Sequence, residues 1–337
     1  MPLKLRVVGK TDKGLVRPAN EDFLHVDNEN RVFAVCDGMG GHQAGEVASM
    51  LAADTLLRVF SYHHEGILTD PTLQLERALP ASGDLLVKAA RIANRAINSK
   101  AYGQKMLAGM GTTIVAAAFE SDLMSIVHVG DSRAYRLGDE GLEALTTDHS
   151  WVTEVQLAKG ISREEAAAFV GKNVITRALG VRENVEVDYR LVRVKVGDIF
   201  LLCSDGLCGY AEDEEIFAVA DQYRRDPEKL VDHLIELAYQ RGGPDNITAV
   251  VIQVLDVNPS QLPEVEPFTV PFEPEPIQQA EDRWVERMQG DDGPRPVQKK
   301  NEETLVAAAK PNRALVIGLF VLFAVIAILI IFLAQSK

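Results

Sequence analysis

The sequence predicts an α+β fold in which an antiparallel β-sandwich is flanked by helices. Apolar and alternating stretches typical of strands come in runs, and the helical stretches between these runs come in pairs. Strict alternation of strand and helix, which would indicate a parallel sheet, is absent. With 337 residues, of which 47% are hydrophobic and 25% charged, the chain is long enough for a substantial core.

The N-terminal part of the chain is predicted to form strands first and helices afterwards. Alternating or apolar stretches predict the strands, and a polar turn between the second and the third predicts a hairpin. Apolar residues at helical spacing predict two helices that cover one sheet. These elements are the strands 3–7, 23–26 and 31–36 and the helices 44–60 and 84–101.

The middle of the chain repeats this order of strands and then helices. A polar segment with helical pieces, residues 148–171, interrupts the strands and is interpreted as an insertion rather than core. The predicted strands are 112–119, 123–129, 134–137, 185–194, 198–203 and 247–255, and the predicted helices are 212–220 and 227–239.

The composition changes after residue 256. Proline and glutamate are interleaved over 257–312, which predicts a disordered linker in which 280–289, including Trp284, form a transient helix at most. About 20 uncharged apolar residues then predict a transmembrane helix at 313–335. Basic residues concentrate before this helix, so we expect a single-pass protein of the cell membrane with a cytoplasmic N-terminal part.

Charge and cysteine content narrow the class of protein. The formal net charge of -14 opposes nucleic-acid binding and fits acidic clusters that bind cations. The three cysteines, Cys36, Cys203 and Cys208, form neither a zinc pattern nor a disulfide framework. We therefore expect buried thiols in a reducing compartment.

Four aspartates share one setting, because each lies beside glycine at the edge of a predicted strand. A single aspartate there is more often a turn residue or a helix cap, but four together indicate a cation site. Oxygen ligands favour Mg²⁺ or Mn²⁺, and two such ions about 3.5 to 4 Å apart can activate water for displacement at phosphorus. The four residues are Asp37, Asp131, Asp205 and Asp245.

Two other kinds of site fit the sequence less well. A nucleotide-binding loop would need Gly-Lys-Ser/Thr or a further glycine where Gln43 stands. Ser132 and Ser204 have no histidine partner by spacing, and Cys36 and Cys203 fit strand packing better than nucleophilic catalysis.

Seven short motifs follow one another over about three quarters of the chain: RPANED at 17–22, DGMGGH at 37–42, GTT at 111–113, VGDSR at 129–133, ITRALG at 175–180, SDGL at 204–207 and GPDNIT at 243–248. In this order they resemble the metal-dependent PPM family, the type 2C Ser/Thr protein phosphatases, and DGMGGH resembles its bacterial branch. The resemblance implies a four-layer αββα sandwich over 1–256, with a binuclear Mn²⁺ or Mg²⁺ centre and a mobile flap at 148–171.

The resemblance also implies roles for the metal ligands. Asp37 would bridge two metal ions and the Gly38 carbonyl would bind one of them, whereas Asp205 and Asp245 would bind the other. Asp131 would form a third, weaker metal site together with Asp205.

Three further residues would support this centre. Glu21 and Asp22 would hold metal-bound waters in an outer shell. Arg17 would grip the substrate phosphate, because a guanidinium matches two phosphate oxygens.

The function implied is a Mn²⁺- or Mg²⁺-dependent phosphatase that hydrolyses phosphoserine and phosphothreonine in proteins by a metal-activated water and opposes a cognate Ser/Thr kinase. The alternative is a catalytically weak, membrane-tethered regulator of the same fold that binds phosphoproteins. One departure concerns Met39, where animal and plant members have a histidine that protonates the leaving alcohol. His42 lies three residues later, and we do not assign that role to it.

Overall fold

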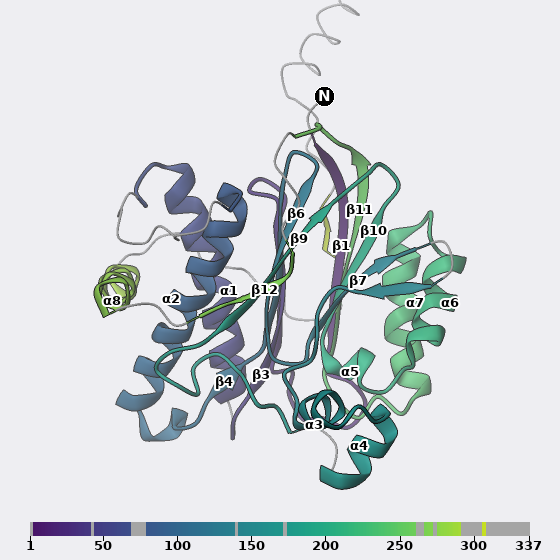
Figure 1. Ribbon diagram of the computed structural model, residues 1–337, viewed down its shortest axis with the longest axis horizontal. Coiled ribbons are helices and arrows are strands. Elements are labelled where there is room, and N and C mark those ends of the chain that lie inside the picture. The colour runs from purple at the N-terminus through teal and green to yellow at the C-terminus, as the bar shows by residue number, and fades with distance from the viewer. Residues whose placement is uncertain are drawn as a thin grey trace, which may run out of the picture. The chain divides into compact units, whose positions relative to one another are not determined.

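Two antiparallel sheets lie face to face in the computed structural model, and helices cover the outer face of each (Figure 1). The structure describes residues 3–41, 44–68, 79–138, 141–170, 174–260, 266–271, 275–290 and 305–307. The predicted α+β class, with two antiparallel sheets and helices, is confirmed.

The first sheet has six strands: β1 (Lys4–Asp12), β7 (Arg133–Leu137), β8 (Leu142–Ala144), β10 (Ile199–Cys203), β11 (Ile247–Asp256) and β13 (Leu305–Ala307). Their order across the sheet is β13-β1-β11-β10-β7-β8, and each neighbouring pair is antiparallel. The longest ladder pairs the first and last strands of the predicted domain, β1 and β11, which ties the two ends of that domain together.

The second sheet contains β2 (Asp22–Asp27), β3 (Val32–Met39), β4 (Gly111–Thr112), β5 (Ile114–Glu120), β6 (Leu123–Val129), β9 (Val187–Arg193) and β12 (Phe268–Val270). The order is β12-β9-β6-β5-β3-β2, and β4 pairs with the end of β3. The predicted hairpin is present as β2 and β3, in a register that places Asp22 opposite Asp37.

Helices cover the outer faces of both sheets. The second sheet packs against α1 and α2, with α8 packed on α2, and the first sheet packs against α5, α6 and α7, whereas α3 and α4 form the predicted insertion (Figure 1). The helices are α1 (Ala44–His64), α2 (Ala81–Gly103), α3 (Trp151–Lys159), α4 (Arg163–Val170), α5 (Asp205–Cys208), α6 (Asp213–Gln222), α7 (Pro227–Gln240) and α8 (Glu275–Gln289), with a short 3-10 helix η2 (Lys105–Leu107).

Strand β3 illustrates why its sequence is an uninterrupted apolar run. Successive side chains of a strand point to opposite faces, and both faces of this strand are covered. Val32, Ala34 and Cys36 pack toward the helices, whereas Phe33 and Val35 pack between the two sheets. All five are fully buried, so the strand delivers Asp37 from inside the core to its end.

The C-terminal segment differs from its prediction. The sequence predicts a disordered linker over 257–312, but the structure places β12 and α8 within it. Trp284 is only 5% exposed and lies against Tyr62, with ring centroids 6.0 Å apart. The linker prediction is therefore wrong for these residues, because an amphipathic face with few apolar residues is enough when α1 and α2 offer a place to bury it.

Two other expectations concern the predicted transmembrane helix and the cysteine thiols. Among the described residues, no helix combines the length and apolar character needed to cross a bilayer. The predicted transmembrane helix at 313–335 lies outside the described residues. Cys36, Cys203 and Cys208 are buried and free, as predicted.

Candidate metal centre

Carboxylates gather where strands of the two sheets end at the same side of the sandwich. Asp37 lies near the end of β3, and Asp205 follows β10, close enough for each carboxyl to affect the pKa of the other. Asp131 follows β6, and Asp245 precedes β11. Together with Asp22, these four residues form what we call the carboxylate centre. The structure thus brings together all four aspartates that the sequence singled out.

Burial and mutual repulsion raise the pKa values in this centre. The pKa of Asp37 lies well above its usual range because the carboxyl is buried and faces the charges of Asp22 and Asp205. Burial and the charge of Asp205 raise the pKa of Asp131 to about 7. Burial also raises the pKa of Asp205. Without cations, these carboxylates are therefore held together at an electrostatic cost.

Two carboxylate oxygens of the centre indicate what would relieve the repulsion between its carboxylates. The Oδ1 atoms of Asp131 and Asp205 are buried and have no hydrogen-bond partner among the described residues. A buried carboxylate oxygen without a partner is costly, and its presence needs an explanation such as an ion. A set of carboxylate oxygens suits a hard divalent cation such as Mg²⁺ or Mn²⁺, so the residues fit the predicted metals.

Two glycines allow the backbone segments of the centre to approach one another closely. A Cβ atom at Gly38 would lie 2.2 Å from the carbonyl oxygen of Gly45 and 2.5 Å from that of Glu21. A Cβ atom at Gly206 would lie 1.8 Å from the carbonyl oxygen of Asn246. Any other residue at these positions would push the strand ends apart.

Asp22 is held by hydroxyl groups rather than exposed to solvent. Its Oδ2 accepts hydrogen bonds from Ser204 Oγ and Thr248 Oγ1, both at 2.7 Å. Burial raises its pKa to about 7, against the effect of these two hydrogen bonds and with that of the Asp205 and Asp245 charges. Because Ser204 and Thr248 belong to the first sheet and Asp22 to the second, these bonds fix the two strand ends relative to each other.

Asn246 is a structural residue of the site to which the sequence analysis assigned no role. Its Oδ1 accepts the backbone N–H of Glu21 at 2.8 Å, and its Nδ2 donates to the carbonyls of Lys13 and Ala19. Asn246 therefore fixes the loop that carries Arg17 and Glu21 beside Asp245. Its place directly after Asp245 in the GPDNIT motif is the signal that could have identified it.

Arg17 places a positive charge at the mouth of the centre. Its Nη2 lies 2.7 Å from Asp245 Oδ2, and its side chain is 48% exposed. The hydrogen bond to Asp245 raises the pKa of Arg17, and the charges of Asp37 and Asp205 act in the same direction. Glu21 lies nearby, and burial raises its pKa although Arg17 lowers it. Arg17 is thus the guanidinium that faces the predicted metal ligands.

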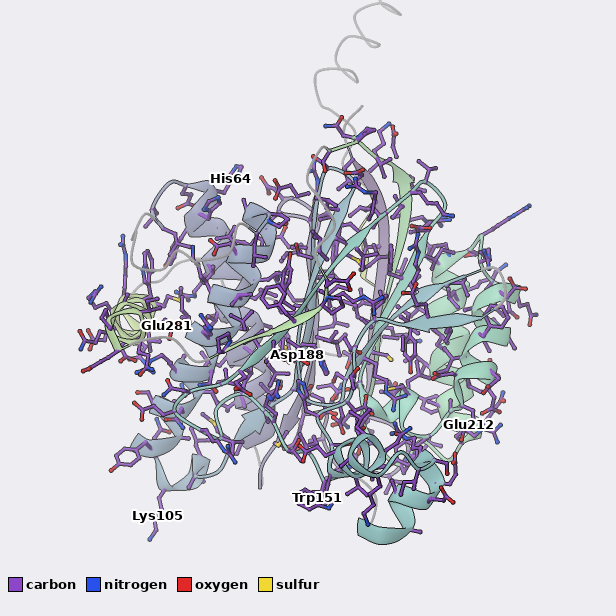
Figure 2. The ribbon with its side chains drawn as sticks, viewed as in Figure 1. His64, Lys105, Trp151, Asp188, Glu212 and Glu281 are labelled. Carbon is purple, nitrogen blue, oxygen red and sulfur yellow. The ribbon has the colours of Figure 1, made fainter. Side chains whose placement is uncertain are left out.

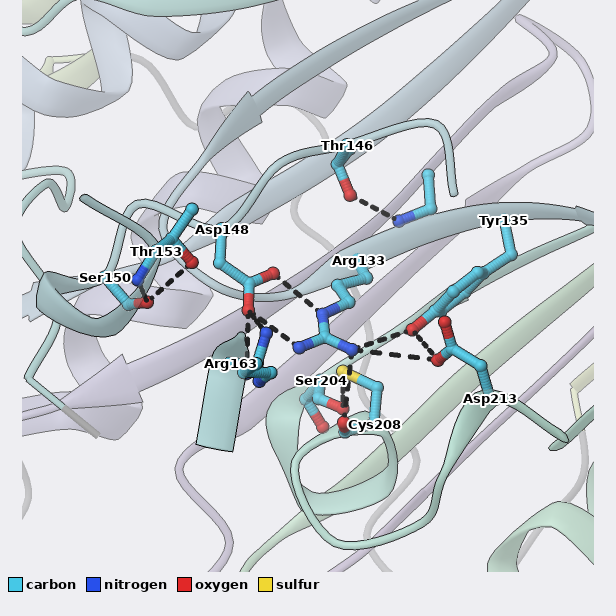
Figure 3. Close-up of polar contacts among 11 residues, drawn as sticks. Arg133, Tyr135, Thr146, Asp148, Ser150, Thr153, Arg163, Ser204, Cys208 and Asp213 are labelled. Carbon is cyan, nitrogen blue, oxygen red and sulfur yellow. Dashed lines mark hydrogen bonds and ion pairs between the residues drawn. The ribbon is translucent and has the colours of Figure 1, made fainter. Parts of the chain in front are cut away.

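The insertion lies next to the carboxylate centre. A cavity of about 400 Å³ is lined by Asp131 and Asp205 on one side and by Arg163 of α4 on the other. Arg133 makes two hydrogen bonds of 2.7 Å to Asp148, and Arg163 approaches the same carboxylate at 3.3 Å (Figure 3). Asp148 therefore joins the insertion to the loop that carries Asp131.

A second polar cluster was not predicted from the sequence. Side-chain ligand atoms of His128, His149 and Asp188 all lie within 4.8 Å of one another, close enough to hold one metal ion. Arg177 also belongs to this group, which we call the histidine cluster, because its Nη1 donates to Asp188 Oδ1 at 2.8 Å. Burial lowers the pKa of His128 to about 3, so this imidazole is neutral.

Hydrogen bonds within the histidine cluster argue against a metal there. The backbone N–H of Gly130 donates to His149 Nδ1 at 3.0 Å, so the ring proton is on Nε2, which lies 3.0 Å from Asp188 Oδ2. A metal bound to Nε2 would have to displace this proton and break the bond from Gly130. Arg177 already supplies a positive charge, 3.1 Å from the same Nε2.

Met39, which stands where the resemblance implies a histidine in animal and plant members, ends β3 and pairs with Gly111 of β4. His42 lies outside the described residues.

The chain is similar to a set of bacterial phosphatases. A family model described as protein phosphatase 2C matches residues 17–251. The serine/threonine protein phosphatase PstP of Mycobacterium tuberculosis is 38% identical over 268 residues, which are 77% of this chain and 47% of that protein. The serine/threonine phosphatase stp of Listeria monocytogenes is 38% identical over 248 residues, 72% of this chain and 94% of that protein. The chain thus spans about half the length of the first of these relatives and nearly all of the second.

A solved structure extends this similarity to three dimensions. The catalytic domain of PstP in complex with two manganese ions matches with a TM-score of 0.63 and 36% sequence identity. The match covers 76% of this chain and 100% of that one. The carboxylate centre and the histidine cluster both belong to residues within the range that the family model matches.

Proposed function

Because this chain belongs to the protein phosphatase 2C family, in its bacterial branch, we propose that it is a Mn²⁺- or Mg²⁺-dependent protein serine/threonine phosphatase. The observation that carries the proposal is the carboxylate centre. Its buried, mutually repelling carboxylates have raised pKa values and two oxygens without partners, which a pair of divalent cations would neutralise.

In this proposal, the carboxylate centre would hold two cations. Their ligands would be Asp37, shared by both, the Gly38 carbonyl for one, and Asp205 and Asp245 for the other. Asp131 would join Asp205 in a third, weaker site. Its unpartnered Oδ1 supports that assignment.

Glu21 and Asp22 would hold metal-bound waters around this centre. Two hydroxyl groups donate to Oδ2 of Asp22 and hold its carboxylate in one orientation. Such an arrangement suits a residue that orients the waters around a metal rather than one that binds the metal itself.

The bound cations would supply an activated water at neutral pH and would stabilise charge at phosphorus during an in-line displacement. Arg17 would bind two phosphate oxygens of the substrate and hold the ester in line with that water. To do so, its guanidinium must turn from Asp245, whose charge the cation would then balance. With Met39 at the edge of the centre, we expect the leaving alcohol to take its proton from solvent or from the substrate's surroundings.

Substrates and location complete the proposal. Phosphoserine and phosphothreonine proteins are the substrate class that the relatives' names support, and a cognate Ser/Thr kinase would generate them. The apolar segment at 313–335 would form a single membrane span, with the phosphatase domain at 1–256 in the cytoplasm and 148–171 as its flap.

The test is phosphate release from a phosphothreonine peptide with Mn²⁺, with EDTA, and after back-titration of Mn²⁺. Asp37→Asn and Asp205→Asn are compared with Asp221→Asn, whose side chain is 57% exposed on α6. We expect activity only with the metal, and only in the wild type and Asp221→Asn. Equal release in every sample would contradict the proposal, and phosphopeptide binding without release would favour the regulator of the same fold.

A further inference from the structure

A segment of the chain beyond the family match packs on the second sheet. We call residues 266–271 and 275–290 the strap, and both parts follow residue 251, where that match ends. Strand β12 extends the edge of the second sheet by pairing with β9, with Phe268 opposite Tyr189 and Val270 opposite Val187. Helix α8 packs on α2, as Figure 2 shows for the helix that carries Glu281.

Charged and apolar contacts hold the strap in place. Arg95 donates two hydrogen bonds of 2.5 Å to the carboxylate of Asp282, from Nε and Nη2. Arg58 donates to the carbonyl of Met288 at 3.2 Å, and Trp284 is buried against α1. Helix α8 is therefore held in one position on α1 and α2, and β12 is held separately by its pairing with β9.

The strap contacts the histidine cluster through one hydroxyl group. Thr269 Oγ1 donates to Asp188 Oδ1 at 2.9 Å, beside the bond from Arg177. Asp188 lies on β9 next to β12, at the centre of the view in Figure 2. Burial alone would raise the pKa of Asp188, but the hydrogen bond from His149, then that from Thr269 and the charge of Arg177, bring it below its usual range. Thr269 is thus one of the donors that keep Asp188 ionised and oriented.

From Asp188 the chain of bonds continues to the carboxylate centre. Asp188 accepts from His149 Nε2, and His149 also bonds to both backbone polar groups of Gly130, which belong to two successive peptide units. The N–H of Gly130 donates to His149 Nδ1 at 3.0 Å, and the backbone N–H of His149 donates to the Gly130 carbonyl at 2.7 Å. Gly130 directly precedes Asp131.

The backbone at Gly130 depends on this support. Its φ of 119° lies in the region that other residues rarely adopt, and a Cβ atom there would come within 2.6 Å of Thr113. A glycine with this freedom needs outside contacts to keep one conformation, and His149 provides two of them. The direction in which Asp131 leaves the chain is therefore set by His149.

We propose that the strap positions Asp131 through Thr269, Asp188, His149 and Gly130, and so tunes the affinity of the weaker cation site. The proposal rests on the proposed function, because it takes Asp131 to be a metal ligand. Groups behind a metal ligand typically change affinity by about 10- to 100-fold. For Asp188→Asn we expect about 10-fold weaker Mn²⁺ binding, and for Thr269→Val, one step further away and exposed, about 3-fold.

The experiment titrates Mn²⁺ into the full chain, stripped with EDTA and dialysed, and measures binding by calorimetry. Thr269→Ser keeps the hydroxyl and should bind Mn²⁺ as the wild type does. Asp282→Asn weakens the seat of α8 without touching the chain of bonds and serves as the matched control. A second measurement, without metal, follows the Gly130 amide and the ring nitrogens of His149 by ¹⁵N NMR, where Thr269→Val and Asp188→Asn should shift both.

Three outcomes overturn the proposal and remain distinguishable. In the first outcome, Thr269→Val and Asp188→Asn bind Mn²⁺ as the wild type does, whereas Asp131→Asn loses one site. This would refute the positioning role and leave the proposed function intact. If Mn²⁺ bound equally weakly to Thr269→Val, Thr269→Ser and Asp282→Asn, the strap would only stabilise the fold in general and would not position Asp131. Wild-type Mn²⁺ binding in Asp37→Asn and Asp131→Asn would instead refute the metal-dependent function itself.

Discussion

The carboxylate centre and the histidine cluster are two buried polar groups with opposite charge balance. The five carboxylates of the carboxylate centre outnumber the nearby guanidinium groups of Arg17 and Arg133, and the pKa values of Asp22, Asp37 and Asp131 are raised. In the histidine cluster, one carboxylate is matched by Arg177 and by the Nε2–H of His149, and the pKa of Asp188 is lowered. A buried charge is stable when it is paired, so the first group needs added cations and the second does not.

The largest expected effect is that of Asp37→Asn, which should lower the activity but raise the stability of the metal-free protein. Asp37→Asn removes the proposed bridging ligand, and losing several kcal/mol of metal assistance corresponds to about a 10³-fold fall in kcat. Without metal, the same change should stabilise the fold by about 1 kcal/mol, because it removes a buried like charge. Phosphate release and urea denaturation in EDTA measure the two effects, with Asp221→Asn as the control. A variant that lost both activity and metal-free stability would contradict the comparison.

The second effect is a dependence of metal-free stability on pH. The pKa values of Asp22 and Asp131 are raised to about 7 in the folded state, above the value of about 3.9 in an unfolded chain. Between these values the folded state binds more protons, so the free energy of unfolding should fall as pH rises from about 4 to 7. Urea denaturation across this range in EDTA tests the sign.

Saturating Mn²⁺ is the control for this pH dependence, because bound cations would keep the carboxylates ionised and flatten the slope. A metal-free protein that was equally stable at pH 5 and pH 7 would show that the repulsion is relieved by other means.

The third effect tests the histidine cluster. Asp188→Asn leaves Arg177 and His149 without their carboxylate and should lower the free energy of unfolding by about 2 kcal/mol in EDTA. The opposite signs expected for Asp37→Asn and Asp188→Asn are the sharpest form of the comparison. Stabilisation by Asp188→Asn would mean that this carboxylate, too, lacks sufficient positive charge.

The smallest effect concerns His128, whose two ring nitrogens are buried without a hydrogen-bond partner among the described residues. Replacing an unsatisfied polar group by an apolar one of similar size removes a desolvation cost, so His128→Leu should stabilise the protein by about 1 kcal/mol. Thermal unfolding with and without a chelator measures it. A loss of stability seen only in Zn²⁺-containing buffer would show that the histidine cluster binds metal after all.

The carboxylate centre could be predicted from the sequence because each ligand carries a local signature. Asp37 and Asp205 each follow a buried apolar strand and precede glycine, and the strands end at the same side of the sandwich. The histidine cluster carries no such signature. His128, His149 and Asp188 come from three separate parts of the chain, and only the pairing of β6 with β9 places His128 opposite Asp188.

The strap shows the other limit of sequence reasoning. The proline and glutamate around it indicate disorder, and α8 has few apolar residues of its own. Its order comes from partners far away in the chain, such as Tyr62 for Trp284 and Arg95 for Asp282. Local composition cannot report on such contacts.

The two C-terminal strands, β12 and β13, affect whether the molecule self-associates. β12 covers the outer edge of β9, and β13 covers the outer edge of β1. A chain ending at residue 256 would keep every proposed ligand but would leave the N–H and C=O groups along both edges open to pairing. Exposed strand edges of this kind recruit strands from neighbouring molecules. The segment after the phosphatase domain therefore also protects it from aggregation, and shortened forms should self-associate at concentrations where the full chain does not.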